Sequence, residues 1–361
     1  MRSRLIRSCI VLLLVAAVCA PAAPGGASPA SAQTLPAEVD NFTWVSAASP
    51  VTANLNSVAV VSADDAWAVG VNGTVLHYDG DSWAVSSTPI PETTALFSVA
   101  MSSAQNGWIV SGDSLFRWDG TQWSSFTTPS PPWPFYMQDI SVPNDTSAWV
   151  TGGIFVCSSG PPCDPENALG TISHWDGSSW SNTSISNAFF SAISMISDSD
   201  GWVVGLHLDP ASGNLRSLIL RWNGSYWATV DHPVTEYPGG SVHYILEDVA
   251  ALNPQIAWTA VSGQNRFLRW DGNSWMELIS PVSGRPSIAV LSADNAWAVG
   301  AEGDIGHWNG HFWTQVPSSV SVTLSSISMA SPFEGWAVGE GGVILHGSMP
   351  AMQTYLPCVS R

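Results

Sequence analysis

A tryptophan-centred repeat dominates the chain and limits what it can fold into. The unit Ser-Ala-Asp-Asn-Ala-Trp-Ala-Val-Gly begins at Ser292, recurs in near-identical form from Ser62, and has a shorter relative from Ser331. Aligning the copies on their first tryptophan gives seven units with spacings of 41, 41, 53, 56, 39 and 39 residues. Self-similarity at a period of about 40 residues is typical of a repeat architecture. The first tryptophans are Trp67, Trp108, Trp149, Trp202, Trp258, Trp297 and Trp336.

Two further aromatic columns follow the first. The second column is always followed by Asp-Gly or Asn-Gly, the strongest short hairpin signal, and the third lies five residues after it. With Trp44 included, 19 of the 20 tryptophans belong to the columns and only Trp133 lies outside. The tryptophans are therefore interpreted as architecture. The second column is Tyr78, Trp118, Trp175, Trp222, Trp270 and Trp308, and the third is Trp83, Trp123, Trp180, Trp227, Trp275 and Trp313.

Short apolar runs between turn residues predict four strands in each unit. In the first unit these are 57–61, 66–70, 74–78 and 82–86. Seven such units predict an all-β chain, a seven-bladed β-propeller with four antiparallel strands per blade. A radial array suits a chain of this length, because each blade packs mainly on its neighbours.

The last blade is predicted to be closed by the N-terminal strand. The seventh unit ends at His346-Gly347 without a third tryptophan. Residues 41–50 resemble residues 81–89, which close the first unit, and Trp44 lies at the matching position. Trp44 therefore supplies the missing member of the third column.

The first 32 residues resemble a secretory signal. Arg2, Arg4 and Arg7 precede an apolar run over 10–20, which is too short to span a bilayer, and small residues follow. The predicted organisation is a signal peptide over 1–32, a linker over 33–40, the propeller over 41–348 and a C-terminal tail over 349–361. We expect a secreted or cell-surface protein without a transmembrane segment, and a monomer.

The charge balance restricts the partners. The chain carries 28 acidic and 10 basic residues, a net charge of −18, and no lysine. Such a chain repels nucleic acid and anionic membranes. The acidity is interpreted as a means of solubility, with Ca²⁺ or a cationic ligand as the alternative. No cofactor is assigned, and Ca²⁺ is the only candidate metal.

Cysteine usage predicts one disulfide. Cys157 and Cys163 bracket a short Gly-Pro-Pro segment and could close a small loop in an oxidising compartment, the alternative being two free thiols. Cys358, in the tail, has no evident partner.

Two polar columns accompany the tryptophans. In six of the seven units a small polar residue lies ten residues before the first tryptophan, on the expected innermost strand, and predicts a narrow, wet central channel. Asp139 and Asp248 are the only charges in this column, and we expect them to be solvated, the alternative being a bound cation. A basic residue recurs beside the tryptophans, and we expect it to stack on a ring or to hydrogen-bond a neighbouring strand. The first column is Ser57, Ser98, Asp139, Ala192, Asp248, Ser287 and Ser326; the second is His77, Arg117, His174, Arg221, Arg269, His307 and His346.

The insertions that break the repeat predict the binding surface. They lie at 129–136, 151–170, 206–216 and 231–244, in connections that emerge on one face of the ring in consecutive blades. Loops on a rigid scaffold are where binding usually resides, and the alternative is drift in tolerant loops. The candidate ligand-binding residues are Trp133, Phe135, Tyr136, His207, Asp209, Asp231, His232, Tyr237, His243 and Tyr244.

The repeat resembles a known class. Trp-Ala-Val-Gly, a following Gly, and a hydrophobic-His-Trp-Asp-Gly run before the last Trp are similar to bacterial secreted propeller repeats of the photosystem II assembly-factor and BNR-like class, over residues 41–348. The resemblance implies the seven-bladed fold and leaves function open. Because BNR-like proteins include sialidases, catalysis has to be weighed. The sialidase-type Asp box is absent, and the nearest stretch, 197–202, does not match it.

The sequence therefore favours a secreted propeller that binds a protein or glycan through the long-loop face of blades two to five. The first alternative is a carbohydrate-active hydrolase or lyase with its cleft on the same face. The second is a structural cell-surface protein without a specific small ligand. We lean against an enzyme and assign no catalytic residue, because the chain has no zinc motif, nucleophile elbow or nucleotide-binding loop.

Overall fold

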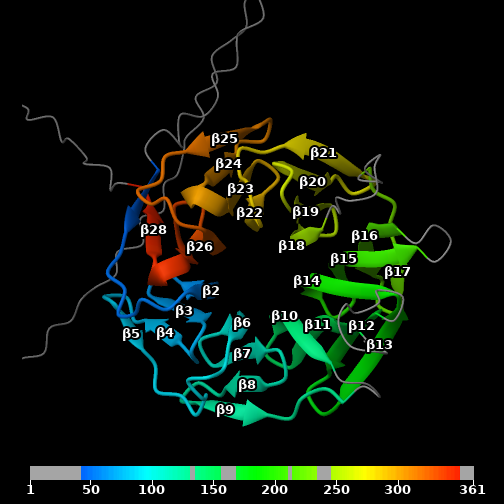
Figure 1. Ribbon diagram of the computed structural model, residues 1–361, viewed down its shortest axis with the longest axis horizontal. Helices are drawn as coiled ribbons and strands as arrows, with labels where there is room; N and C mark the ends of the chain where they lie inside the picture. The colour runs from blue at the N-terminus through cyan, green and yellow to red at the C-terminus, as the bar shows by residue number, and fades with distance from the viewer. Residues whose placement is uncertain (1–41, 131–134, 156–167, 210–213, 234–244, 350–361) are drawn as a thin grey trace, which may run out of the picture. The chain divides into compact units, whose positions relative to one another are not determined.

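The computed structural model describes residues 42–130, 135–155, 168–209, 214–233 and 245–349. They form seven four-stranded antiparallel sheets, arranged as blades around a centre (Figure 1). The predicted all-β, seven-bladed propeller is confirmed. None of the described helices is long and apolar enough to cross a membrane.

Six blades use four consecutive strands, ordered from the inside outward. Blades one to three are β2 (Leu55–Ser62), β3 (Asp65–Gly70), β4 (Val75–Tyr78) and β5 (Trp83–Val85); β6 (Leu96–Ser103), β7 (Asn106–Ser111), β8 (Leu115–Trp118) and β9 (Trp123–Phe126); β10 (Tyr136–Asn144), β11 (Ser147–Phe155), β12 (Ala168–Trp175) and β13 (Trp180–Ser186). Blades four to six are β14 (Ala188–Ser197), β15 (Asp200–Asp209), β16 (Asn214–Trp222) and β17 (Trp227–Thr229); β18 (Leu246–Asn253), β19 (Ile256–Val261), β20 (Arg266–Trp270) and β21 (Trp275–Ile279); β22 (Ser287–Ser292), β23 (Asn295–Val299), β24 (Ile305–Trp308) and β25 (Trp313–Val316). Short 3₁₀ helices, η2 (Ala301–Gly303) and η3 (Glu340–Gly342), follow the second strands of blades six and seven.

The seventh blade is closed by the N-terminal strand, as predicted. It contains β26 (Leu324–Ser331), β27 (Glu334–Gly339) and β28 (Ile344–Ser348), and β1 (Thr43–Ser46) pairs antiparallel with β28, with Trp44 opposite Gly347. Gly347 occupies the place of the second-column aromatic. Phe42 fills the space instead, because a Cβ built on Gly347 would lie 2.8 Å from the Phe42 ring. The N-terminal segment thus supplies two missing aromatics.

The third turn of each complete repeat is held by its Asp or Asn. Asp79 Oδ1 accepts hydrogen bonds from the backbone N–H groups of Asp81 and Ser82, both at 3.0 Å. Gly80 has φ = 97°, in the region that favours glycine. The same side-chain bond and positive φ recur in blades two to six, which explains why the Asp-Gly and Asn-Gly pairs repeat.

The tryptophans join the blades to one another. Each first-column tryptophan is at most 3% exposed and meets the third-column tryptophan of the next blade edge to face, at interplanar angles of 72–90°. Such pairs contribute about 0.5–1.5 kcal/mol each beyond area burial. The ring of seven pairs is complete only because Trp44 packs on Trp297, at 5.6 Å. The other pairs are Trp67–Trp123, Trp108–Trp180, Trp149–Trp227, Trp202–Trp275, Trp258–Trp313 and Trp336–Trp83.

The basic column stacks on these tryptophans, as predicted. His77 lies 4.1 Å from the Trp67 ring, and the Arg221 guanidinium lies 5.0 Å from Trp202. His77 also bonds Asp65 at 2.9 Å, and an equivalent polar partner is present in every blade except the fifth, where the position is Ile256. Burial lowers the pKa of His307 to about 4, so its tilted contact with Trp297 involves a neutral imidazole ring. The column is therefore part of the scaffold.

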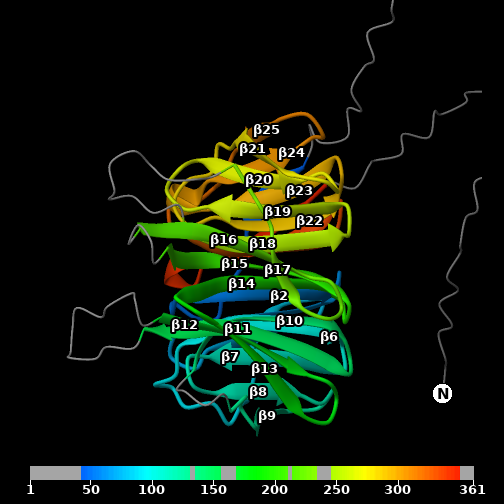
Figure 2. The same cartoon turned by 90° about the vertical axis from the view of Figure 1, so that its right-hand side faces the viewer.

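The described residues at both ends of the insertions in blades three and four are strand, whereas we expected loops. In blade four β15 continues to Asp209 and β16 begins at Asn214. In blade three β11 runs to Phe155, β12 starts at Ala168, and seven β12 residues pair with the long β13. Both hairpins reach out on the same side of the ring (Figure 2). Added cross-strand pairs offset the entropy cost of the inserted residues.

Candidate functional site

The innermost strands surround a polar cavity of about 490 Å³. All seven blades contribute lining residues, mostly from the first positions of β2, β6, β10, β14, β18, β22 and β26. These positions follow the connections between blades, so the cavity lies at the end of the ring where those connections and the long hairpins emerge. The predicted wet channel and the predicted long-loop face therefore meet at this cavity, which we call the channel mouth.

Five residues of the small polar column link one inner strand to the next. Ser57 Oγ accepts the Val99 N–H at 3.2 Å, and Ser326 Oγ accepts the Val58 N–H at 3.2 Å. Asp139 and Asp248 do the same for Ile193 and Ile288, both at 2.9 Å. The column thus satisfies backbone donors that the sheets leave unpaired. We expected solvated carboxylates here; the structure shows both bound to the neighbouring blade.

The Asp139 carboxyl group at the mouth is buried and accepts three hydrogen bonds. Its Oδ1 accepts the Ser98 hydroxyl at 2.7 Å and the Ile140 N–H at 2.8 Å, while Oδ2 binds blade four. Burial raises the pKa of this carboxyl to about 6, and the negative charge of Asp248 adds to the effect. Desolvation therefore outweighs three hydrogen bonds.

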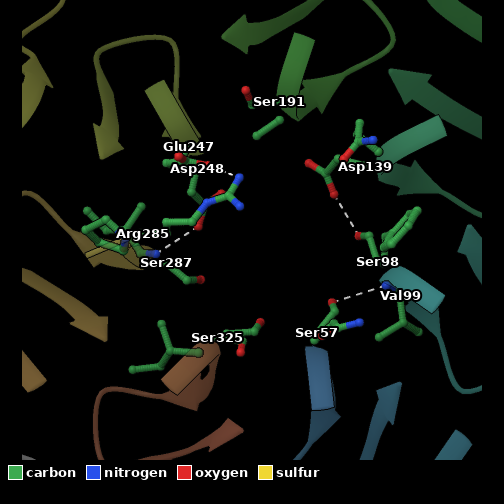
Figure 3. Close-up of a pocket in the computed structure, with 18 of the residues that line it drawn as sticks. Ser57, Ser98, Val99, Asp139, Ser191, Glu247, Asp248, Arg285, Ser287 and Ser325 are labelled. Atoms are coloured by element: carbon green, nitrogen blue, oxygen red, sulfur yellow. Dashed lines mark hydrogen bonds and ion pairs between the residues drawn. The ribbon is translucent and has the colours of Figure 1, made fainter. Parts of the chain in front are cut away.

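Asp248, Glu247 and Arg285 form the other side of the mouth. Burial likewise raises the pKa of Asp248. The Glu247 side chain is only 8% exposed and accepts a 2.7 Å bond from Arg285, which is 77% exposed. Figure 3 shows Arg285 beside Glu247 and Asp248, across the cavity from Asp139. Three carboxyl groups and one guanidinium leave the mouth with an excess of negative charge.

Of the predicted binding residues that the structure describes, Tyr136 contacts a residue that lines this cavity. Its ring is 49% exposed and lies 5.7 Å from that of Phe97, which lines the mouth. Phe135 instead packs against the hydrophobic cluster between blades two and three. Of the two predicted aromatic residues that the structure describes, Tyr136 is therefore the one available to a ligand at the mouth.

The remaining described candidates lie elsewhere on the same blades. His207 is half-buried and pairs with Ala188 and Arg216, and Asp209 ends β15. Asp231 is exposed. His232 follows the outermost strand of blade four and binds Ser217. The structure does not bring these four residues together with Tyr136. Trp133, Tyr237, His243, Tyr244, Cys157, Cys163 and Cys358 lie outside the described residues.

Sequence reasoning missed the ring of residues that precedes the polar column. These side chains form the rim of the mouth and are of six residue types in seven blades, which is why no repeat pattern marked them. The one sequence signal that could have found this ring is its position, because each member stands immediately before a residue of the small polar column. The ring comprises Asn56, Phe97, Gln138, Ser191, Glu247, Pro286 and Ser325.

Within the described ranges no group of three or more His, Cys, Asp or Glu side chains could hold a metal ion. Asp139 and Asp248 each use a carboxylate oxygen on a backbone N–H. Nothing in this part of the chain therefore assigns a metal to the mouth.

Comparison with solved structures identifies similar folds. The structure titled "YCF48 bound to D1 peptide" matches with a TM-score of 0.63 and 19% identity over 88% of this chain and 100% of that one. YCF48 from Cyanidioschyzon merolae matches with a TM-score of 0.60 and 17% identity, over 84% and 98%. Virginiamycin B lyase from Staphylococcus aureus matches with a TM-score of 0.65 and 14% identity, over 86% and 100%.

No family model matches the chain, and no curated protein matches it. The resemblance to the photosystem II assembly-factor class is confirmed by the YCF48 structures. At these identities the likeness is one of fold. The comparisons therefore support the fold alone, and the function has to be argued from the residues of this chain's own channel mouth.

Proposed function

We propose that the protein is a secreted propeller that binds an extracellular protein through the channel mouth and the surrounding long-loop face. The segment that enters the mouth carries a basic side chain. The observation that carries this proposal is the cavity itself, which all seven blades build. Among the described residues its charged lining consists of Asp139, Glu247, Asp248 and Arg285.

The electrostatics favour a cationic group. The pKa values of Asp139 and Asp248 are both raised because burial removes the carboxylates from water, and the negative charges of Asp248 and Glu247, respectively, add to the effect. An ammonium or guanidinium placed between them would favour their ionised form. The chain's net charge of −18 adds a long-range attraction that speeds encounter with a basic partner.

The rim supports an extended ligand. Tyr136 and Phe97 give an aromatic patch on blades two and three, and Arg285 gives a donor on the opposite side. Exposed tyrosine and arginine are enriched among residues that dominate binding energy. The fold is compatible with such a role, since the YCF48 structure holds a peptide.

Catalysis is the alternative to be tested, since the virginiamycin B lyase structures share the fold. The mouth favours binding over acid–base chemistry, because Asp139 and Asp248 already accept backbone hydrogen bonds that hold the ring together. A general acid or base exchanges a proton with its substrate, whereas each of these carboxyl groups has one oxygen committed to a backbone N–H of the next blade.

An array screen tests the proposal. The protein would be applied to peptides of matched length bearing two Lys or Arg, two Asp or Glu, or neither, and to a glycan array, each with and without Ca²⁺. We expect retention on the basic peptides that weakens as salt rises. Binding to glycans alone would replace the protein ligand with a sugar, and no binding on either array would favour a structural role.

A further inference from the structure

A serine and a histidine on blade four form a hydrogen-bonded pair that the channel mouth does not use. Ser217 lies on β16, and His232 lies three residues beyond β17, directly across the strand pair. The Ser217 Oγ and His232 Nε2 atoms are 2.8 Å apart. The hydrogen bonding between β16 and the outer segment continues past β17, because the Val230 N–H donates to the Ile219 carbonyl oxygen at 2.9 Å.

The second ring nitrogen fixes the direction of this bond. His232 Nδ1 lies 3.2 Å from the Val230 carbonyl oxygen, which can only accept. Nδ1 therefore carries the proton, and Nε2 is the acceptor for the Ser217 hydroxyl. Burial lowers the pKa of His232, so the ring is neutral at pH 7. A hydroxyl, a neutral imidazole acceptor and a group that orients the ring are the elements of an activated serine.

The pair is spatially separate from the mouth. Ile219, two residues from Ser217 on the same strand, is buried in the cluster between blades four and five. Alternate residues of a strand point to the same face, so Ser217 also faces blade five. The mouth is lined by the inner strands, whereas β16 and His232 belong to the outer half of the blade.

We propose that Ser217 is a nucleophile, activated by His232, that takes an acyl group from an ester. The Ser217 oxygen attacks the ester carbonyl carbon while its proton passes to His232 Nε2. The carbon–oxygen bond to the leaving alcohol breaks, and the alcohol takes that proton. Water then attacks the acyl-serine with His232 again as base, releasing a carboxylic acid and restoring the hydroxyl.

A fluorophosphonate probe tests this proposal on the full chain, because it reacts with activated serines and forms a stable adduct with loss of fluoride. Intact mass and peptide mapping should show one adduct, on Ser217. Ser217→Ala should abolish it, and His232→Gln should slow labelling by about 100-fold, within the usual effect of a general base. Ser225→Ala, at an exposed serine in the same blade, is the matched control and should label like the parent.

The pH dependence separates a base from a structural partner. The rate of labelling should fall only when the pH is below the ordinary histidine pKa of about 6.5, because protonated His232 cannot accept the serine proton. Thermal melts would show that each variant is folded. The proposal is overturned by an absent adduct, by an adduct on another residue, or by a His232→Gln variant that labels at the parental rate. None of these results bears on peptide binding at the mouth.

Discussion

Asp139 should make the stability of the ring depend on pH. The carboxyl has a pKa of about 6 in the folded protein, against 3.8 as its ordinary value. The folded state therefore binds more protons than the unfolded state between these values. Unfolding free energy must fall as pH rises through this window, and the loss is complete above the folded-state pKa. The groups that face Asp139 across the mouth are Asp248, Glu247 and Arg285.

The size of the effect follows from the two pKa values. Integrating the proton linkage gives a fall of about 1 to 2 kcal/mol between pH 5 and pH 7.5 from this one group. Asp139→Asn removes the titration but retains an oxygen that can accept from Ser98. Other titrating groups also change the stability of both proteins with pH. The prediction therefore concerns the unfolding free energy of the wild type minus that of Asp139→Asn, which should fall by about 1 to 2 kcal/mol from pH 5 to pH 7.5.

Urea unfolding at pH 5.0, 6.0 and 7.5, followed by tryptophan fluorescence, measures this difference. Asp113→Asn, at an exposed position away from the cavity, is the control and should parallel the wild type. A difference between wild type and Asp139→Asn that stays constant across the three pH values would refute the claim that the carboxyl is desolvated.

Three further variants test the scaffold, each by its urea midpoint. Trp297→Ala should cost about 3 to 5 kcal/mol, because the ring is 1% exposed and packs on Phe42 and Trp44; a cost below about 1 kcal/mol would show that the column is not core. Deleting residues 41–50 should destabilise the whole ring by unpairing β28, and a parental melt would disprove closure. Tyr78→Trp should add about 1 kcal/mol to the free energy of unfolding. Tryptophans at this position in four blades donate Nε1–H to a carbonyl of their first turn, whereas Tyr78 donates to Gly80. An unchanged midpoint would mean that the space beside Tyr78 cannot take the larger ring.

The fold could be read from the sequence because every blade repeats the same physical solution. Three features recur in seven or nearly seven units: the hairpin glycines, the buried tryptophans and the stacked basic residues. Their repetition at a fixed period distinguishes them from chance local patterns. Closure was also predictable, since Trp44 completes a column that the seventh unit leaves open. Phe42 was not, because it fills a space that only the Gly347 backbone creates.

The site was only partly predictable, because function lies where the repeat fails. The positions of the insertions predicted the face on which the channel mouth opens, yet no periodic signal announced the strand pairing of the described residues in 206–216. Arg285 lies in an ordinary connection, and its role depends on a buried Glu247 one blade earlier. The His232–Ser217 bond joins β16 to the segment that follows β17. Such contacts come from tertiary geometry, which a single sequence does not encode locally.

The location of the ligand is the most direct test of the proposed function. Two exposed tyrosines offer a matched pair: Tyr136, 49% exposed at the channel mouth, and Tyr226, 63% exposed in the turn before β17 on the opposite face. Calorimetric titration of the best-binding basic peptide into the wild type and both alanine variants compares the two faces. Tyr136→Ala should weaken affinity about 10-fold or more, the scale of a binding hot spot, while Tyr226→Ala binds like the wild type. Loss of affinity in Tyr226→Ala with Tyr136→Ala unaffected would place the ligand on the other face and contradict the proposal.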